Sequence, residues 1–387
     1  MSLPIFPGSP RLPADPPRLR RRHLLALPLA AALPTTALPR PARAALPPIV
    51  DAAGRTVILK APAERIVLGF NYEEFTAIAG PAGWDRVVGF ARALWADWRP
   101  SVFRRYAAVI PRLATLPDVG NTDDSSFSVE KVIALRPDLV ILAQWSFSVL
   151  GQAVAQLEAL GIPVLVIDYN AQMPERHVAS TIAMGIATGS EARARALADL
   201  YLTRVADIQA RARRATVRPR VYVELGQAGA DTIGNTYWKG MWGRILDLIE
   251  ANNIAAERIA GAWGPLNPEF VLAANPEAIF IAGSSWVNRP NAVLTGFDAD
   301  IETTRARLAP YTRRKGWENL VAVRNGQVFA IEHGLCRALF DYTAMYYIAK
   351  QLYPAQFADI DPVAELRAYH EAYLPVRFEG TWMGRLS

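Results

Sequence analysis

Two segments of similar sequence decide the fold: SVEKVIALRPDLVI, residues 128–141, and NPEFVLAANPEAIF, residues 267–280. Each opens on a residue that commonly caps helices, Ser128 or Asn267, and carries a glutamate in the expected first turn. Such side chains accept hydrogen bonds from free N–H groups, and an acidic residue suits the positive end of a helix. Each segment then meets a proline and enters an apolar run, which is typical of a helix followed by a buried strand. One copy in each half of the chain predicts two lobes of similar construction.

Strands and helices are expected to alternate on both sides of these segments. In the first half, strands are predicted at 65–69, 85–89, 138–142 and 163–167, and helices at 73–79, 129–135 and 149–160. In the second half, strands are predicted at 220–224, 278–282 and 327–331, and helices at 241–250, 268–274 and 339–352. This alternation is typical of α/β proteins with parallel sheets.

One stretch between the two halves is too long for an ordinary crossover helix. From Glu191 to about residue 215 the chain has neither glycine nor proline. Its apolar residues recur at helical spacing, as at Leu197, Leu200, Tyr201, Val205 and Ile208, which predicts one amphipathic helix about 35 Å long. The expected fold is therefore α/β, with two Rossmann-like lobes of mainly parallel sheet joined by this helix. The expected divisions are an N-terminal lobe at 45–188, a linking helix at 189–216 and a C-terminal lobe at 217–387.

Residues 1–44 have the pattern of an export signal. Three arginines, Arg20 to Arg22, precede a short apolar stretch, and Ala42 and Ala44 offer small residues where a signal peptidase cleaves. The sequence RRHLL at 21–25 resembles a twin-arginine signal. We therefore expect a periplasmic protein, exported by a twin-arginine-like signal peptide.

Composition excludes several classes of protein. The chain is 51% hydrophobic and 20% charged, an ordinary globular composition, and it has no apolar run of about 18 residues that could span a membrane. Seven arginines and one aspartate in residues 1–44 account for the whole net charge of +6. The rest of the chain is neutral, so no nucleic-acid partner is expected. The single Cys336 excludes an internal disulfide.

The order of motifs resembles that of periplasmic binding proteins for iron chelates, haem and vitamin B12, which serve ATP-driven importers. The matching motifs are LPDVG at 116–120, the segment 128–141, LGIPVLVID at 160–168, GIATG at 185–189, NPE at 267–269 and 275–277, and GWENLVAV at 316–323 with NGQV at 325–328. The resemblance covers about residues 49–353. It implies two lobes bridged by one long helix, with modest hinge motion. It also implies that Glu130 and Glu269, which match the family's docking glutamates, bind arginines of the permease subunits of an ABC importer.

Ligand contacts are expected from the loops at the strand ends that face the cleft between the lobes. Aromatic and basic residues concentrate there. The candidate ligand-binding residues are Tyr72, Trp95, Trp98, Arg99, Trp145, Tyr237, Trp238, Trp286, Arg289, His333 and Arg337. Aromatic rings give contact area to a bulky guest, and arginine pairs with anionic oxygens. This mixture favours an iron(III) chelate, either a ferric siderophore or a citrate-type complex. We expect a monomer with no intrinsic cofactor.

Other ligands stay open at this point. Haem would need an axial tyrosine or histidine, for which Tyr72, Tyr106, Tyr237 and His333 are candidates. Cobalamin or an oxyanion such as molybdate is also possible, and His333 could equally be a hydrogen-bonded loop residue. A bare zinc or manganese ion usually needs several histidines, and the chain after the signal has only three, far apart in sequence.

An exported enzyme is the rival function. The sequence has no Gly-x-Gly-x-x-Gly after a strand, no phosphate-binding Gly-x-x-x-x-Gly-Lys-Ser/Thr and no Gly-x-Ser-x-Gly elbow. The export signal, the paired glutamates and the aromatic cleft favour binding and transport over catalysis, so we expect no enzymatic activity.

Overall fold

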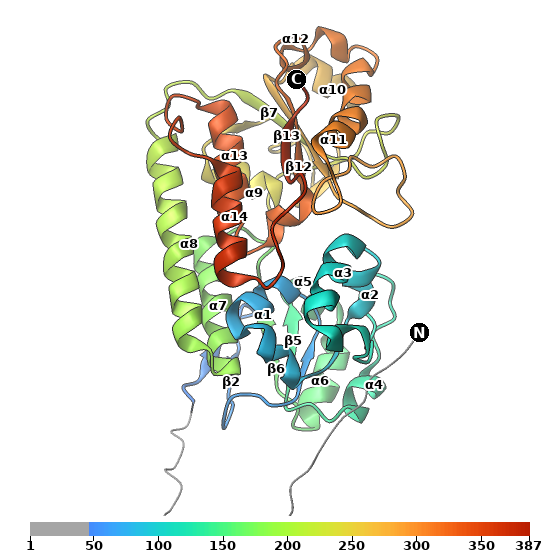
Figure 1. Cartoon of the computed structure of the whole chain (residues 1–387), viewed down its shortest axis with the longest axis vertical. Coiled ribbons are helices and arrows are strands. Elements are labelled where there is room, and N and C mark those ends of the chain that lie inside the picture. Colours follow the sequence, from blue (N-terminus) through green and yellow to red (C-terminus); the bar gives the residue numbers. More distant parts are fainter. Residues whose placement is uncertain (1–45) are drawn as a thin grey trace, which may run out of the picture. The chain divides into compact units, whose positions relative to one another are not determined.

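The structure is a computed structural model that describes residues 46–387. The predicted export signal, residues 1–44, lies outside the described residues. Two separate β-sheets, each with its own helices, make up two lobes (Figure 1). In the described part of the chain, no helix is long and apolar enough to cross a membrane.

The first lobe holds a four-stranded sheet in the order β4-β3-β5-β6, with every neighbouring pair parallel. The strands are β3 (Ile66–Leu68), β4 (Val87–Phe90), β5 (Leu139–Ala143) and β6 (Val164–Ile167). All five residues of β5 are buried, as its continuous apolar run predicts. The helices of this lobe are α1 (Tyr72–Ala79), α2 (Arg92–Ala96), α3 (Pro100–Val109), α4 (Val129–Ala134), α5 (Gln144–Val149) and α6 (Gly151–Ala159). A short antiparallel pair, β1 (Ile49–Val50) and β2 (Thr56–Val57), precedes them.

The second lobe holds a five-stranded sheet in the order β13-β12-β11-β7-β9. It is parallel except for β13, which pairs antiparallel with β12 at the edge. The strands are β7 (Arg220–Leu225), β9 (Asn252–Asn253), β11 (Ala278–Gly283), β12 (Val328–Glu332) and β13 (Met383–Arg385), and β8 (Asn235–Tyr237) pairs separately with β10 (Trp263–Pro265). The helices are α9 (Trp242–Leu248), α10 (Pro268–Ala274), α11 (Ile301–Leu308) and α12 (Val321–Arg324). The predicted fold class, two lobes of mainly parallel sheet, is confirmed.

The two repeated segments fold alike. The Ser128 Oγ accepts from the Lys131 N–H at 3.2 Å at the start of α4, and the Asn267 Oδ1 accepts from the Glu269 N–H at 2.8 Å at the start of α10. After each helix one residue before the proline, Arg136 or Asn275, takes a left-handed backbone with φ of 48° or 47°. This reversal turns the chain from the helix into the buried strand. The capping predicted from the sequence is confirmed in both copies.

The long helix is α8 (Glu191–Ala212), of 22 residues, which contacts α1 in the first lobe and α13 (Tyr342–Leu352) in the second. It ends about three residues earlier than predicted and packs along α7 (Pro174–Thr188), a helix that the sequence analysis did not predict. At their crossing a Cβ on Gly185 would lie 2.3 Å from the Ala194 Cβ. A glycine is therefore required for the two helices to approach this closely.

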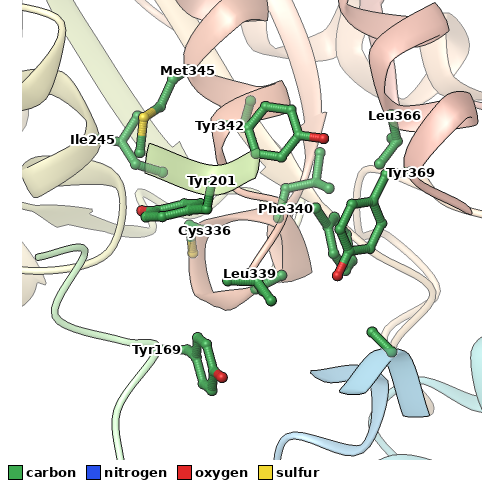
Figure 2. Packing of buried hydrophobic residues seen from close by; sticks show 14 of the residues in the cluster. Tyr169, Tyr201, Ile245, Cys336, Leu339, Phe340, Tyr342, Met345, Leu366 and Tyr369 are labelled. Carbon is green, nitrogen blue, oxygen red and sulfur yellow. The ribbon is translucent and has the colours of Figure 1, made fainter. Parts of the chain in front are cut away.

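The chain after residue 352, which the sequence left unassigned, returns to the junction of the lobes. Here α14 (Pro362–Tyr373) packs on α13 and also touches α1. Figure 2 shows the apolar packing at this junction, where Tyr201 of α8 lies with Tyr342 and Met345 of α13 and Tyr369 of α14. The core is continuous from one lobe to the other, which limits the lobes to modest relative movement.

The helix predicted at 149–160 is present as α6, within two residues of its expected bounds. The short helix α5, directly after β5, was not predicted, and the chain bends at Leu150 between the two. Every other predicted strand or helix lies within about three residues of its expected bounds.

Candidate functional site

The candidate site is a cavity of about 40 Å³ between the two lobes. Its wall comes from the segments that follow β3, β4, β5 and β12. The lining residues are Phe70, Asn71, Tyr72, Glu73, Glu74, Leu94, Trp95, Trp98, Arg99, Asp123, Trp145, Gly334, Arg337 and Ala338. The carboxyl ends of parallel strands are the usual place for a ligand in α/β proteins. A larger hollow of about 570 Å³ near Lys60, Asp138 and Glu158 lies at the opposite strand ends and only the first lobe lines it, so we do not take it as the site.

The cavity brings together six of the eleven candidate residues: Tyr72, Trp95, Trp98, Arg99, Trp145 and Arg337. The other five, Tyr237, Trp238, Trp286, Arg289 and His333, are not part of its wall. Most of these five belong to an aromatic cluster inside the second lobe. There the His333 Nδ1 accepts from the Trp242 Nε1–H at 3.1 Å, and the rings of Trp286 and Tyr237 lie 5.8 and 6.0 Å from the imidazole. Trp238 is half-buried beneath Lys239, and Arg289 is exposed.

The aromatic wall has a rigid inner part and a more accessible outer part. Tyr72 stacks on Trp95 at 4.7 Å, and Trp95 stacks on Trp84 at 5.9 Å. The Tyr72 hydroxyl donates to the Ala91 carbonyl, so its oxygen is already engaged. Trp98 is 40% exposed and Trp145 is half-buried, edge-on to Phe70 at 5.5 Å. The rings of Trp98 and Trp145 are therefore the ones best placed to cover the face of a guest.

The site also contains a buried ion cluster of three side chains, of which the sequence predicted only Arg99. Arg99 donates to the Glu73 carboxylate, and its guanidinium lies 3.7 Å from the Glu332 Oε2. Glu73 belongs to the first lobe and Glu332 ends β12 of the second, so Arg99 bridges the lobes. The three side chains are 13, 8 and 2% exposed, respectively. The signal that could have revealed Glu332 is an acidic residue at the end of an apolar strand, where a charge is otherwise disfavoured.

The neighbouring Glu74 ties the lobes together a second time. Its Oε1 accepts from the Leu339 N–H of the second lobe at 3.1 Å, and its Oε2 accepts from the Asn71 amide at 3.3 Å. Burial, followed by the charge of Glu73, raises the pKa of Glu74 from 4.5 to about 7. This carboxyl group therefore takes up a proton near neutral pH.

Replacing Glu74 with glutamine is expected to remove part of the pH dependence of stability. Between about pH 5 and 7 the folded chain holds a proton on Glu74 that the unfolded chain has lost, so stability falls as pH rises from about 5 through the raised pKa. The effect is at most about 3 kcal/mol, from about 1.4 kcal/mol for each pKa unit. Denaturant unfolding of both proteins at pH 5 and 8 measures it. A glutamine variant with the same loss between these pH values as the unsubstituted protein contradicts the prediction.

Several polar atoms at the cavity have no hydrogen-bond partner within residues 46–387. They are the Asn71 Oδ1, the Glu73 Oε1, the Arg99 Nε–H and the indole N–H groups of Trp95 and Trp145. Asn71 has a left-handed backbone, with φ of 59°, at the turn between β3 and α1. Because buried polar atoms are normally paired, these groups mark positions where a guest can donate or accept a hydrogen bond. The described residues contain no group of three or more His, Cys, Asp or Glu side chains placed to hold a metal ion.

Comparison with known proteins agrees with this geometry. Residues 78–333 match the family described as periplasmic binding protein. The crystal structure of the TroA-like periplasmic binding protein FepB from Veillonella parvula is 35% identical in sequence, with a TM-score of 0.83, and the match covers 88% of this chain and 99% of that one.

Two further proteins are more distant. An uncharacterised ABC transporter substrate-binding lipoprotein, YvrC, from Bacillus subtilis is 27% identical over 56% of this chain, and the match spans 62% of that protein's length. The molybdate-bound periplasmic protein MolA from Haemophilus influenzae is 18% identical, with a TM-score of 0.65 over 86% of this chain and 99% of that one. At this identity MolA shows a shared fold only.

Proposed function

The chain belongs to the periplasmic binding protein family, and from this premise we propose that it captures a small organic chelate of iron(III) in the periplasm and delivers it to the permease of an ABC importer. The observation that carries the proposal is the cavity between the lobes, with aromatic rings on its wall and the ends of strands from both sheets around it. We propose a transport role without enzymatic activity.

Arg337 is the residue that we propose binds the anionic part of the chelate. Its guanidinium lies over the ring of Phe70 at 5.7 Å, and no carboxylate within residues 46–387 forms an ion pair with it. Arg99, which the sequence favoured equally, is already held by Glu73 and Glu332. A free guanidinium can pair with a carboxylate through two hydrogen bonds.

The volume of the cavity implies movement. About 10–15 Å³ of such a cavity is room for one water molecule, so a cavity of about 40 Å³ holds only a few water molecules and is far too small for a ferric chelate. The lobes must therefore separate before such a guest enters. The continuous core along α8 and α13 leaves the side opposite α8 as the place where they can part (Figure 1).

Haem and oxyanions fit the wall less well. Of the four axial candidates for haem, Tyr106 is fully buried, Tyr237 and His333 do not line the cavity, and the Tyr72 hydroxyl is engaged with a backbone carbonyl. An oxyanion such as molybdate suits the small volume, but it has no use for the aromatic rings of Trp98 and Trp145 on the wall. The chelate is therefore our preferred guest.

The absorbance spectrum and metal content of the protein, purified from the periplasm without unfolding, test the proposal. A charge-transfer band in the visible region with stoichiometric iron supports a ferric chelate. A Soret band instead indicates haem, and a colourless protein that gains thermal stability with molybdate indicates an oxyanion. Either of the last two results overturns the chelate proposal.

Replacing Arg337 with alanine is expected to weaken binding of ferric citrate about tenfold or more, because a charge-assisted hydrogen bond contributes about 1.5–3 kcal/mol. Quenching of tryptophan fluorescence measures the affinity, since Trp98 and Trp145 lie on the wall. Arg289 is an exposed arginine away from the cavity, so Arg289→Ala is the matched control and should bind as the unsubstituted protein does. Equal loss in both variants contradicts the assignment.

A further inference from the structure

The segment from Asp97 to Arg105, which joins α2 to α3 and includes the first turns of α3, reaches from the first lobe to the second. It is anchored in the first lobe because Trp95 and Tyr106 on either side of it are buried in that lobe's core. In Figure 1, α3 faces the second lobe on the side away from α8, with α11 above it. In this region the sequence predicted ligand contacts for Trp95, Trp98 and Arg99 and no role for Arg104 or Arg105.

Its outer contacts are ion pairs between the lobes. Arg104 lies 2.5 Å from Asp298 and Arg105 lies 3.2 Å from the same carboxylate. Arg105 also pairs with Glu379, and its guanidinium lies over the ring of Phe297 at 4.9 Å. Both acidic residues belong to the second lobe, so two arginines of one lobe face two carboxylates of the other.

Hydrogen bonds also join this segment to the second lobe. The Ser101 and Ser285 hydroxyls lie 2.7 Å apart, and the Val287 N–H donates to the Asp97 carbonyl at 3.4 Å. Further in, Arg99 lies between Glu73 and Glu332 at the cavity itself. The segment thus contacts the second lobe both at the exposed surface and at the cavity wall.

We propose that residues 97–105 are a latch that holds the lobes together on the side opposite α8, and that the outer ion pairs of Arg104 and Arg105 set the fraction of molecules whose cavity is open to a guest. When the lobes separate, the contacts farthest from the hinge lengthen most, so these contacts oppose opening most effectively. The outer pairs are partly solvated, with 64 and 30% of the arginine side chains exposed. Ion pairs as exposed as these contribute little to stability and are weak enough to break.

The distance between two spin labels tests the latch without any guest, so its outcome is independent of the ligand proposed above. Exposed Ala108 on α3 and exposed Glu302 on α11, each replaced by cysteine, place one label on each lobe. The native Cys336 is fully buried, and the chain without these substitutions checks that it takes no label. Pulsed dipolar spectroscopy then gives the populations of short and long distances.

Arg104→Ala with Arg105→Ala is expected to raise the ratio of open to closed molecules about tenfold, since an exposed ion pair contributes up to about fivefold to an equilibrium. Raising the salt from about 50 to about 500 mM should shift the unsubstituted protein in the same direction and the double variant much less. Arg195→Ala is the matched control, because Arg195 pairs with Glu191 within α8 at a similar exposure of 61%. It should leave the distances unchanged.

A charge exchange separates the ion pairs from general effects of substitution. Arg105→Glu should open the lobes, and Arg105→Glu combined with Glu379→Arg should reverse part of the opening, because the carboxylate at position 105 still faces Asp298. The latch is overturned if the double alanine variant keeps the distances of the unsubstituted protein, if Arg195→Ala opens the lobes equally, or if the unsubstituted protein is already open at low salt.

Discussion

Replacing Glu130 and Glu269 together by alanine is expected to abolish binding to the permease that we propose as the partner of this protein, with a loss of at least about a hundredfold in affinity. Both glutamates are exposed in the first turns of α4 and α10, and Figure 1 shows both helices on the side of their lobes away from α8. Truncating one member of a charge pair across an interface commonly costs 2 kcal/mol or more, so about 4 kcal/mol is expected for two. Co-purification with the permease in lipid nanodiscs, followed by titration, measures the loss.

The control variant replaces two other glutamates in similar positions. Glu175 and Glu302 are exposed residues in the first turns of α7 and α11, so Glu175→Ala with Glu302→Ala removes the same charge and a similar helix-end interaction. This variant should bind the permease normally. The affinity of the Glu130 and Glu269 variant for ferric citrate should stay within about twofold, because neither residue lies at the cavity. Normal permease binding by this variant, or a loss of chelate affinity, would show that the docking face lies elsewhere.

The parts of the fold that the sequence predicts are those with a strong local pattern. The runs that became β5 and β11 are buried along their whole length, and a continuous apolar run between a proline and a polar loop has few other structures open to it. β13 has no such pattern: it has three residues, and it exists because Met383 pairs with Ile331, far away in sequence. Similarly, α7 contains Gly185, which lowers helix propensity and is there to allow close contact with α8.

One part of the candidate site could be predicted from the sequence, because side chains that follow parallel strands meet at one edge of the sheet. This rule brought Tyr72, Trp98, Trp145 and Arg337 to one cavity, because each follows a parallel strand. It could not separate His333 from Arg337. The two lie at the ends of one short 3-10 helical turn after β12, and that turn places Arg337 on the cavity wall and His333 against Trp242. Nor could this rule show that Arg99 already pairs with Glu332, because the two residues are far apart in the sequence.

Arg99→Ala is expected to destabilise the folded protein by about 4 kcal/mol at pH 8. The substitution leaves the Glu73 and Glu332 carboxylates facing one another without their common cation, and removing one partner of a buried ion pair typically costs 3–5 kcal/mol. The hydroxyl of Ser284 still donates to Glu332 at 2.9 Å, which compensates only in part. Denaturant unfolding measures the change, and Arg195→Ala on the surface of α8 should cost less than about 1 kcal/mol.

The origin of this loss can be separated from a simple loss of packing. If it comes from unpaired charge, then it should shrink at pH 5, where buried carboxyl groups can take up protons and no longer need a cation. Arg99→Met combined with Glu73→Gln and Glu332→Gln should also recover most of the stability, because a neutral set of similar volume has no charge to compensate. A loss that is equal at pH 5 and 8, and that the triple variant does not reduce, would mean that Arg99 stabilises the junction of the lobes through its aliphatic stem instead of its charge. The guanidinium would then be free to serve the guest, and the assignment of that role to Arg337 alone would be wrong.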